Sequence, residues 1–472
     1  MMMMKLVRSC NSSNLLGDHN VLGRGFRAML YITQTQTQTP TTSSTSKDTL
    51  FNRISLAGDP RVSMFPILDQ WVEGGRTVDK SELKTIIKLL RKYKRFNHAL
   101  QLSEWMSHSL NLAPSPGDVA VQLDLVSKVH GLEQAEKYFN NIPDTLRTFH
   151  VCGALLNCYA NKKSLAKAET IMQKMREFGI LKKSLSYNVM LNLYSKMGQQ
   201  EKFDSLIKEM EEKGISCERS TVYIRLNAYA AVSDIKGMEK LLTHMESDPR
   251  FTMDWNSYVI AANGYLKAGL FEKSLEMLKK SEQHIHSKRR GFAYEILLTL
   301  YAGLGNKDEL YRIWNLYKQM GKIYNRGYFR MISSLVKLDD LDGAEKVLVE
   351  WESVNTSFDF DIPNLLINAY CKKGLLGKAE MYISRAIERG KEPTAGTWDH
   401  LATRYYKDNQ MAKAVEIMKK AIMADQRGWK LNYVTLTACV VYLKETGDTE
   451  VAEEFTRLLC LPNMDISQRC LK

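Results

Sequence analysis

A similar phrase recurs along this chain of 472 residues at intervals of 34 to 36 residues. It reads NCYANKKSLAKAE at 157–169, NLYSKMGQQEKFD at 192–204, NGYLKAGLFEKSL at 263–275 and NAYCKKGLLGKAE at 368–380. A marker position, its tyrosine, falls at Tyr159, Tyr194, Tyr229, Tyr265, Tyr301, Leu335, Tyr370 and Tyr405, and the register extends to Leu90, Val126 and Leu443. Such a period is typical of a repeat protein, in which each supersecondary unit packs on its neighbours.

Within one repeat the apolar residues follow a helical period. Tyr187, Leu191 and Tyr194 form one stripe, Leu206 and Met210 form a second, and a glycine-containing turn separates the two. Two such amphipathic helices bury their apolar faces only by stacking on other repeats. The sequence therefore predicts an all-α fold: a right-handed superhelical solenoid of about ten to eleven helix-turn-helix repeats of about 35 residues, with the marker tyrosine in the core.

Outside the repeats the composition changes. Residues 1–47 contain Lys5, Arg8, Arg24, Arg27 and Lys47, many Ser and Thr, and a single acidic residue, Asp18. This composition predicts an organellar transit peptide at 1–32, followed by a low-complexity linker at 33–49. We predict an N-terminal capping helix region at 50–79, the repeat array at 80–460 and a C-terminal tail at 461–472. The early arginines favour mitochondrial localisation, with the plastid as the alternative.

The overall composition is that of a folded protein, and its charge favours a polyanionic partner. The chain has 66 Lys and Arg against 53 Asp and Glu, a net charge of +13, and such an excess favours a nucleic-acid partner. No run of 18 apolar residues occurs, so no membrane span is expected. The eight cysteines never form a CxxC pair, which predicts buried thiols in a reducing compartment.

Two families of helical repeats have nearly this length. Tetratricopeptide repeats need glycine three residues before the marker, and none of the repeats from Tyr159 to Tyr405 has it there. The segments 185–215 and 360–393 instead resemble pentatricopeptide repeats, and 64–106 resembles the start of a group of short plant proteins of that family. The resemblance covers about residues 80–460, and implies the pure-repeat P-class, without an editing or nuclease domain.

A lysine recurs two residues after the marker, at the predicted end of the first helix. It is present as Lys92, Lys128, Lys196, Lys267, Lys337, Lys372 and Lys407, which we call the lysine row. Such a row can track the phosphate backbone of single-stranded RNA, and lysine there also complements the helix macrodipole. Both interpretations hold together, and we predict RNA-backbone contact.

Members of this family read one base per repeat, through the fifth residue of a repeat and its last residue. The resemblance implies base-facing side chains at Asn188 with Glu218, Tyr223 with Asp254, Asn364 with Thr394, and Asp399 with Asn432. These pairs match the usual amide or hydroxyl with Asp, Asn or Ser only in part. Other repeats, such as the one with Gly153 and Lys183, do not match, so we expect weak sequence preference.

No pattern for catalysis or metal binding is present. The chain has no P-loop, GxSxG, HExxH or dinucleotide-binding glycine motif, and the stretch after its last repeat, CLPNMDISQRCLK, contains neither the HxE nor the CxxC motif of editing members. Asp339, Asp340 and Asp342 are predicted to cap the second helix of their repeat. We predict that the protein is not an enzyme and has no cofactor, metal or catalytic residue.

These observations favour a mitochondrial, non-catalytic RNA-binding adaptor. It would bind single-stranded or structured organellar RNA and act in its stabilisation, processing, splicing or translation. The alternative is a protein-interaction solenoid, such as a subunit of a mitochondrial ribosome or another ribonucleoprotein assembly. The poorly matched base-facing positions favour this alternative, and the lysine row opposes it.

Overall fold

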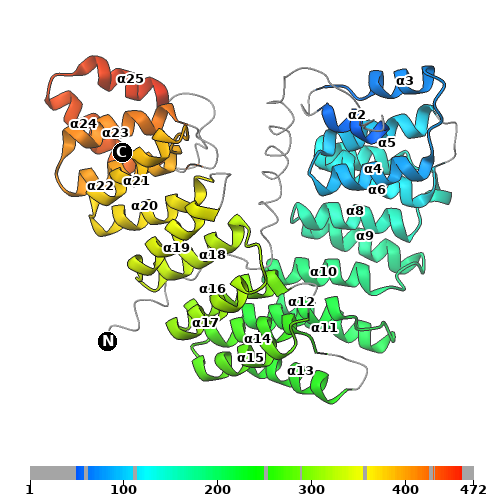
Figure 1. Cartoon of the computed structure of the whole chain (residues 1–472). Coiled ribbons are helices and arrows are strands. Elements are labelled where there is room, and N and C mark those ends of the chain that lie inside the picture. The colour runs from blue at the N-terminus through cyan, green and yellow to red at the C-terminus, as the bar shows by residue number, and fades with distance from the viewer. Residues whose placement is uncertain are drawn as a thin grey trace, which may run out of the picture. The chain divides into compact units, whose positions relative to one another are not determined.

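The computed structural model describes residues 49–57, 62–109, 114–248, 253–286, 290–354, 359–424, 429 and 431–459. The predicted transit peptide (1–32), the predicted linker up to residue 48 and the predicted tail (461–472) lie outside these residues. Within the described residues all regular structure is helical, which confirms the predicted fold class (Figure 1).

The helices are, in chain order, α2 (Leu50–Leu56), α3 (Phe65–Glu73), α4 (Lys80–Lys92), α5 (Phe96–Ser109), α6 (Pro116–Val129), α7 (Leu132–Asn140), the 3-10 helix η4 (Asp144–Leu146), α8 (Phe149–Asn161), α9 (Leu165–Glu177), α10 (Ser184–Lys196), α11 (Gln200–Glu212), α12 (Arg219–Ala231), α13 (Ile235–Ser247), α14 (Trp255–Lys267), α15 (Phe271–Gln283), α16 (Arg290–Gly303), α17 (Lys307–Lys318), α18 (Asn325–Lys337), α19 (Leu341–Val354), α20 (Asp361–Lys373), α21 (Leu376–Glu388), α22 (Ala395–Lys407), α23 (Met411–Met423), α24 (Tyr433–Glu445) and α25 (Thr449–Leu459). From α4 onward they form consecutive pairs that follow the predicted period. Helices α2 and α3 precede these pairs, within the stretch predicted as an N-terminal cap.

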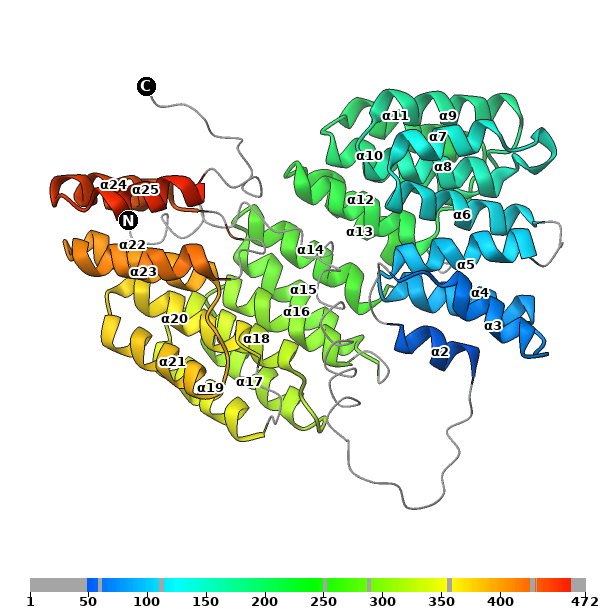
Figure 2. The same ribbon diagram turned by 90° about the horizontal axis from the view of Figure 1, so that it is seen from above.

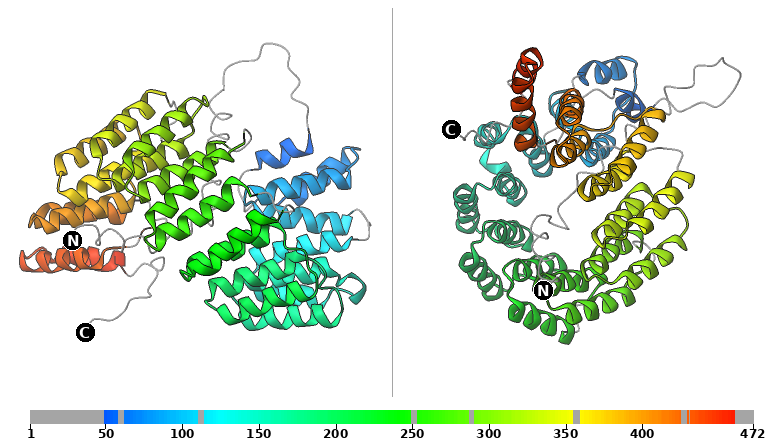
Figure 3. Two further views of the ribbon diagram at one scale, coloured as in Figure 1. Left: turned by 90° about the horizontal axis from the view of Figure 1, so that it is seen from below. Right: turned by 90° about the vertical axis from the view of Figure 1, so that its left-hand side faces the viewer.

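The chain divides into two compact units, Met1–Met238 and Glu239–Lys472, and the boundary lies inside α13. In each unit first helices of successive pairs pack against one another, as α8 does on α10 and α18 does on α20. Second helices pack on the first helix of their own pair, as α9 does on α8 and α19 does on α18. Each unit is therefore a stack with two layers, and both layers can be followed in Figures 2 and 3.

One residue with positive φ closes the turn between the two helices of every pair. Glycine fills this position in six pairs, whereas Lys94, Lys163, Ser233, Asp339 and Asn409 fill it in the other five. In ten of these pairs the next amide donates back to the marker residue: Ser164 N lies 2.9 Å from Tyr159 O, and Leu270 N lies 2.9 Å from Tyr265 O. This bond is the Schellman arrangement that ends a helix and reverses the chain.

One of the three acidic residues at the α18–α19 turn, Asp340, has the predicted capping role, whereas Asp339 is the positive-φ residue of the turn. Asp340 Oδ1 accepts a hydrogen bond from Gly343 N at 3.1 Å, in the first turn of α19. The carboxylate satisfies one of the amides that the start of a helix leaves without an intrahelical partner. Asp340 therefore has a structural role.

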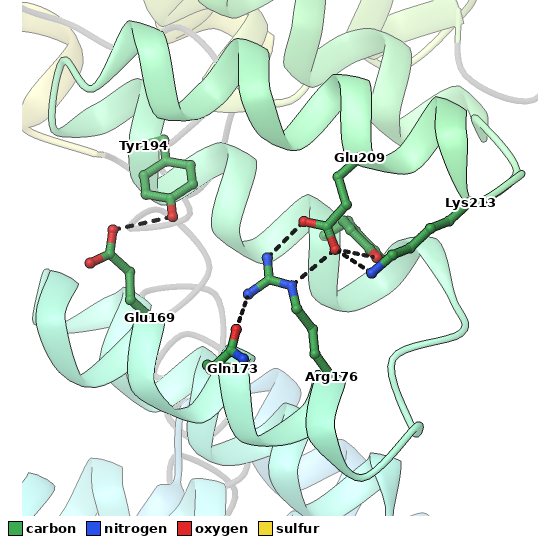
Figure 4. A network of polar contacts seen from close by, with 7 residues as sticks. Glu169, Gln173, Arg176, Tyr194, Glu209 and Lys213 are labelled. Atoms are coloured by element: carbon green, nitrogen blue, oxygen red, sulfur yellow. Dashed lines mark hydrogen bonds and ion pairs between the residues drawn. The ribbon is translucent and has the colours of Figure 1, made fainter.

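The marker residues lie in the core, as predicted. Tyr301 and Tyr370 are fully buried, and only Tyr229 is half-buried among the marker tyrosines. Several marker hydroxyls also bond to a carboxylate of the preceding repeat, which the sequence pattern did not reveal. Tyr194 Oη donates to Glu169 Oε1 at 3.2 Å (Figure 4). Lys202 Nζ lies 2.7 Å from the same oxygen.

The same Glu–Tyr–Lys contact recurs in other repeats. Tyr265 Oη and Lys273 Nζ lie 3.2 and 2.6 Å from Glu239 Oε1, and Glu345 receives Tyr370 and Lys378 in the same way. Each contact joins the second helix of one pair to both helices of the next pair. The repeat period therefore fixes polar links between neighbours as well as the apolar core.

A second network joins α9 to α11 and is centred on Glu209. Arg176 donates to both carboxylate oxygens, with Nε 2.9 Å from Oε1 and Nη2 2.8 Å from Oε2 (Figure 4). Lys213 Nζ and Tyr187 Oη also donate to Oε1, at 2.8 and 3.1 Å. Burial raises the pKa of Glu209, but the hydrogen bonds from Arg176 and Lys213 outweigh burial and hold it at about 2.

Candidate nucleic-acid interface

The seven lysines of the lysine row occupy equivalent places in the fold. Each is exposed and is one of the last two residues of a first helix, as predicted. Lys92, Lys128 and Lys196 belong to the first unit, and Lys267, Lys337, Lys372 and Lys407 belong to the second. Because the first helices of each unit are stacked, the lysines of that unit lie along one edge of its first-helix layer.

The surroundings of these lysines differ. Lys128 Nζ lies 2.7 Å from Asp124 Oδ2 and 4.9 Å from the centre of the Phe96 ring, so its charge is partly compensated. In the part of the chain that the structure describes, Lys196, Lys267, Lys372 and Lys407 make no ion pair. Their charge is therefore available to a dissolved polyanion, and these four carry the strongest case for RNA-backbone contact.

Additional lysines lie at the same turns and were missed by the search for a single recurring position. The third repeat has Asn161 at that position, but the exposed Lys162 and Lys163 follow it directly. Lys94 is likewise exposed in the turn after α4, and Lys373 beside Lys372 forms an ion pair with Asp339. Considering the whole turn would have revealed them.

The last residues of the four candidate base-facing pairs each stand directly before a first helix, and three of them cap it. Asp254 Oδ1 accepts from Ser257 N at 3.0 Å, and Thr394 Oγ1 and Asn432 Oδ1 accept from Thr397 N and Thr435 N at 3.4 Å. Glu218 precedes α12 without capping it, and accepts instead from Ser184 Oγ at 2.8 Å. Asp, Asn and Thr are favoured N-caps, so their presence at these positions has a structural reason of its own.

The fifth residues point into contacts between neighbouring first helices. Asn364 Oδ1 accepts from Thr397 Oγ1 at 2.8 Å, and Thr397 also contacts Thr394, so the pair Asn364 and Thr394 meets through this hydroxyl. Asn188 instead donates to Ser220 Oγ at 3.1 Å, and not to Glu218. The structure thus brings Asn364 and Thr394 together, whereas Asn188 and Glu218 have separate partners.

Asp399 is 3% exposed, and it accepts from the indole Nε1 of Trp429 at 3.2 Å and from the backbone of Asn432. Burial raises the pKa of its carboxyl. Among the described residues Asp399 Oδ1 and Asn188 Oδ1 have no hydrogen-bond partner, although both atoms are buried. A base edge reaches these oxygens only if a neighbouring side chain moves.

Tyr223, the fifth residue of the remaining candidate pair, is half-buried.

The seventh repeat shows why some positions do not match the family pattern. Its fifth residue, Glu295, is 7% exposed and forms an ion pair with Arg326 of the next repeat, at 2.6 Å from Oε2 to Nε. Tyr317 Oη donates to Oε1 at 3.1 Å, and the Arg326 guanidinium lies 5.0 Å from the centre of the Phe292 ring. The position that would face a base is occupied by an ion pair between repeats.

No other chemistry is apparent in the part of the chain that the structure describes. There, no group of three His, Cys, Asp or Glu side chains is placed to hold a metal ion. The described helices include none with the length and apolar character needed to span a membrane. Cys152, Cys158, Cys371 and Cys439 are buried free thiols, and burial raises the pKa of Cys371 to about 12.

Comparison with known proteins agrees with this architecture. The family model described as a pentatricopeptide repeat domain matches residues 149–197, and the model described as PPR repeat matches 185–215, 257–284 and 362–390. A mitochondrial pentatricopeptide repeat-containing protein of Arabidopsis thaliana is 47% identical over 412 residues, covering 87% of this chain and 84% of the relative. The chain belongs to the pentatricopeptide repeat family.

Other members extend the comparison. The large ribosomal subunit protein mL101 (rPPR4) of Arabidopsis thaliana is 43% identical over 422 residues, covering 89% of this chain and 86% of that protein. Among solved structures, the pentatricopeptide repeat protein PPR10 in complex with an 18-nt psaJ RNA element is similar, with a TM-score of 0.55 at 20% identity over 87% of this chain. The chain spans 60% of the length of that PPR10 chain, and the likeness supports the fold.

Proposed function

We propose that this pentatricopeptide repeat protein is a P-class, non-catalytic RNA-binding adaptor of mitochondria. It acts by covering a tract of organellar RNA, which then cannot pair with itself or enter a nuclease. RNA stabilisation, processing, splicing or translation is the setting for this activity. The observation that carries the proposal is the row of exposed lysines, four of them without an ion pair in the described chain, at equivalent first-helix ends.

The spacing of the first helices suits this proposal. Packed helices lie about 8–10 Å apart, and repeat proteins of this kind bind about one nucleotide per repeat. A lysine at the same place on successive first helices can then neutralise successive phosphates within one unit. Because the candidate base-facing side chains are engaged as caps or in contacts between repeats, backbone contacts supply most of the affinity, and sequence preference is weak.

The relatives support the location. One relative of high identity is named as mitochondrial, and another is named as a protein of the large ribosomal subunit. The second name supports a second candidate function, in which the protein is a subunit of a mitochondrial ribonucleoprotein. In that setting the lysine row binds the RNA of the assembly, whereas the second-helix layer is available to proteins.

The experiment that tests the proposal is fluorescence anisotropy of the protein with a random single-stranded RNA pool across a salt series. One variant carries Lys196→Gln, Lys267→Gln, Lys372→Gln and Lys407→Gln. Each lost phosphate contact lowers the slope of log affinity against log salt by about 0.7, so the variant should lose about 3 from the slope.

A matched control carries Lys137→Gln, Lys208→Gln, Lys236→Gln and Lys346→Gln, which remove the same charge from exposed positions on second helices. The control should retain most of the wild-type slope. Equal losses in the two variants would show that net charge, and not the lysine row, drives binding. Absence of wild-type binding at low salt would overturn the RNA-binding proposal and leave the protein-interaction alternative.

A further inference from the structure

A basic hollow lies in the first unit, away from the lysine row. It has a volume of about 580 Å³ and lies between the start of α8 and the segment that joins α9 to α10. Its polar lining comes from Arg147 and His150 on one side, Lys182 and Lys183 on the other, and Asp144 at the edge. The opposite end of α8, which carries Lys162 and Lys163, is about 18 Å away at 1.5 Å per residue.

Negative charge does not balance this lining. Arg147 Nη1 lies 2.7 Å from Asp144 Oδ1, and Asp144 is the one carboxylate among the described residues that line the hollow. Lys182 and Lys183 are exposed, and in the described part of the chain neither makes an ion pair. Lys183 Nζ lies 5.6 Å from the centre of the Phe149 ring, so the ammonium group packs over an aromatic side chain and not beside a carboxylate.

Two helices, α8 and α10, begin at the hollow. Lys183 and Thr148 are the N-caps of α10 and α8, and neither side chain caps its helix. Within the described residues Thr148 Oγ1 and Arg147 Nε are buried without a hydrogen-bond partner. Cations at helix N-termini oppose the macrodipole, whose positive end favours anions. The hollow therefore brings together two helix N-termini, the Thr148 hydroxyl and several cationic side chains, but only one carboxylate among its described lining residues.

We propose that this hollow binds a phosphate group. This proposal rests on the proposed function and extends it, because the phosphate group belongs to RNA. It is either the 5′-terminal phosphate or a phosphate of the backbone. The third repeat has Gly153 and Lys183 in place of a base-reading pair. A phosphate site there accounts for this departure, since Lys183 contributes positive charge at the position where Asp254, Thr394 and Asn432 of other repeats cap a helix.

The first test uses inorganic phosphate and the full chain, so that it does not depend on RNA binding. Thermal unfolding is followed with millimolar orthophosphate or with chloride at equal ionic strength, in wild type and in the double variant Lys182→Gln/Lys183→Gln. In chloride the variant should be the more stable protein, because two cations have left a helix N-terminus. Orthophosphate should raise the unfolding temperature of the wild type, and this rise should be lost in the variant.

A control variant, Lys137→Gln/Lys208→Gln, has the same net charge and should respond to orthophosphate as the wild type does. A phosphate response in Lys182→Gln/Lys183→Gln equal to that of the control would overturn the proposal. If the wild type failed to bind RNA but kept this response, the function proposed above would fail while the anion site stood.

The second test identifies the source of the phosphate with one RNA oligonucleotide carrying either a 5′-phosphate or a 5′-hydroxyl. A lower affinity of Lys182→Gln/Lys183→Gln only for the phosphorylated form assigns the hollow to the RNA terminus. A decrease of about 1 in the salt slope with both forms assigns it to the backbone. Unchanged affinity and slope with both forms would overturn the assignment to RNA.

Discussion

Replacing Glu209 by glutamine tests how strongly polar links hold neighbouring repeats together. The carboxylate accepts from Arg176 at both oxygens and from Lys213 and Tyr187 at one. Its pKa is lowered from 4.5 to about 2. Each pKa unit corresponds to about 1.4 kcal/mol, so this lowering of the pKa corresponds to about 3 kcal/mol of stability. Because the network is partly exposed to solvent, screening reduces the expected effect to about 2 kcal/mol.

The pH dependence follows from the direction of the pKa shift. Because the pKa of Glu209 is lower in the folded than in the unfolded chain, its contribution is complete above about pH 5 and is lost as pH falls from 4.5 toward 2. We therefore expect Glu209→Gln to lower the free energy of unfolding by about 2 kcal/mol at pH 7. The difference from wild type should shrink steadily below pH 4.5.

Urea unfolding followed by circular dichroism at a series of pH values measures this difference. Amide hydrogen exchange at pH 7 localises the effect, with faster exchange expected in α9, α10 and α11. Glu212→Gln is the matched control, because Glu212 is on the same helix and its contact with Lys208 is 3.8 Å long and largely exposed. Equal effects of the two substitutions, or a Glu209→Gln deficit that persists unchanged at pH 3, would refute the reasoning.

Two further predictions concern the turns and the buried Asp399. Lys163→Gly should stabilise the protein by up to about 1 kcal/mol, because Lys163 has a φ of 55°, whereas Lys162→Gly, one residue earlier, should destabilise it. Gly269→Ala, at a φ of 78°, should cost about 1 kcal/mol, and all three changes are measured by urea unfolding. Because burial raises the pKa of Asp399, Asp399→Asn should be more stable than wild type at pH 7, and thermal unfolding should show this advantage vanish below pH 3.8.

The sequence predicted the fold because the repeat places the same physical requirements at the same interval. Marker residues such as Tyr301 and Tyr370 had to be apolar enough for the core, and a turn residue had to follow each of them. The contacts between repeats could not be predicted in the same way. Glu209 with Arg176, and Glu295 with Arg326, depend on which side chains face each other across two helices, and the period alone does not give that alignment.

The lysine row could be predicted because it has the same period, but its electrostatic state could not. Lys128 has the same position as Lys196, yet Lys128 forms an ion pair with Asp124, one helical turn before it, which also pairs with Arg91, whereas Lys196 has no ion pair in the described part of the chain. The base-facing positions were carried over by resemblance. The structure shows that three of their last residues cap a following helix, a role that accounts for Asp, Thr and Asn there without any ligand.

The distribution of ion pairs explains how a chain with many acidic residues can still present a positive edge. Acidic side chains on second helices are engaged by cations of the next repeat, as Glu169 is by Lys202, Glu239 by Lys273 and Glu345 by Lys378. These carboxylates are therefore neutralised within the second-helix layer and do not reach the lysines at the first-helix ends. In each unit the stabilising ion pairs and the unpaired lysines lie on different parts of the repeat, so substitutions in one set should leave the other intact.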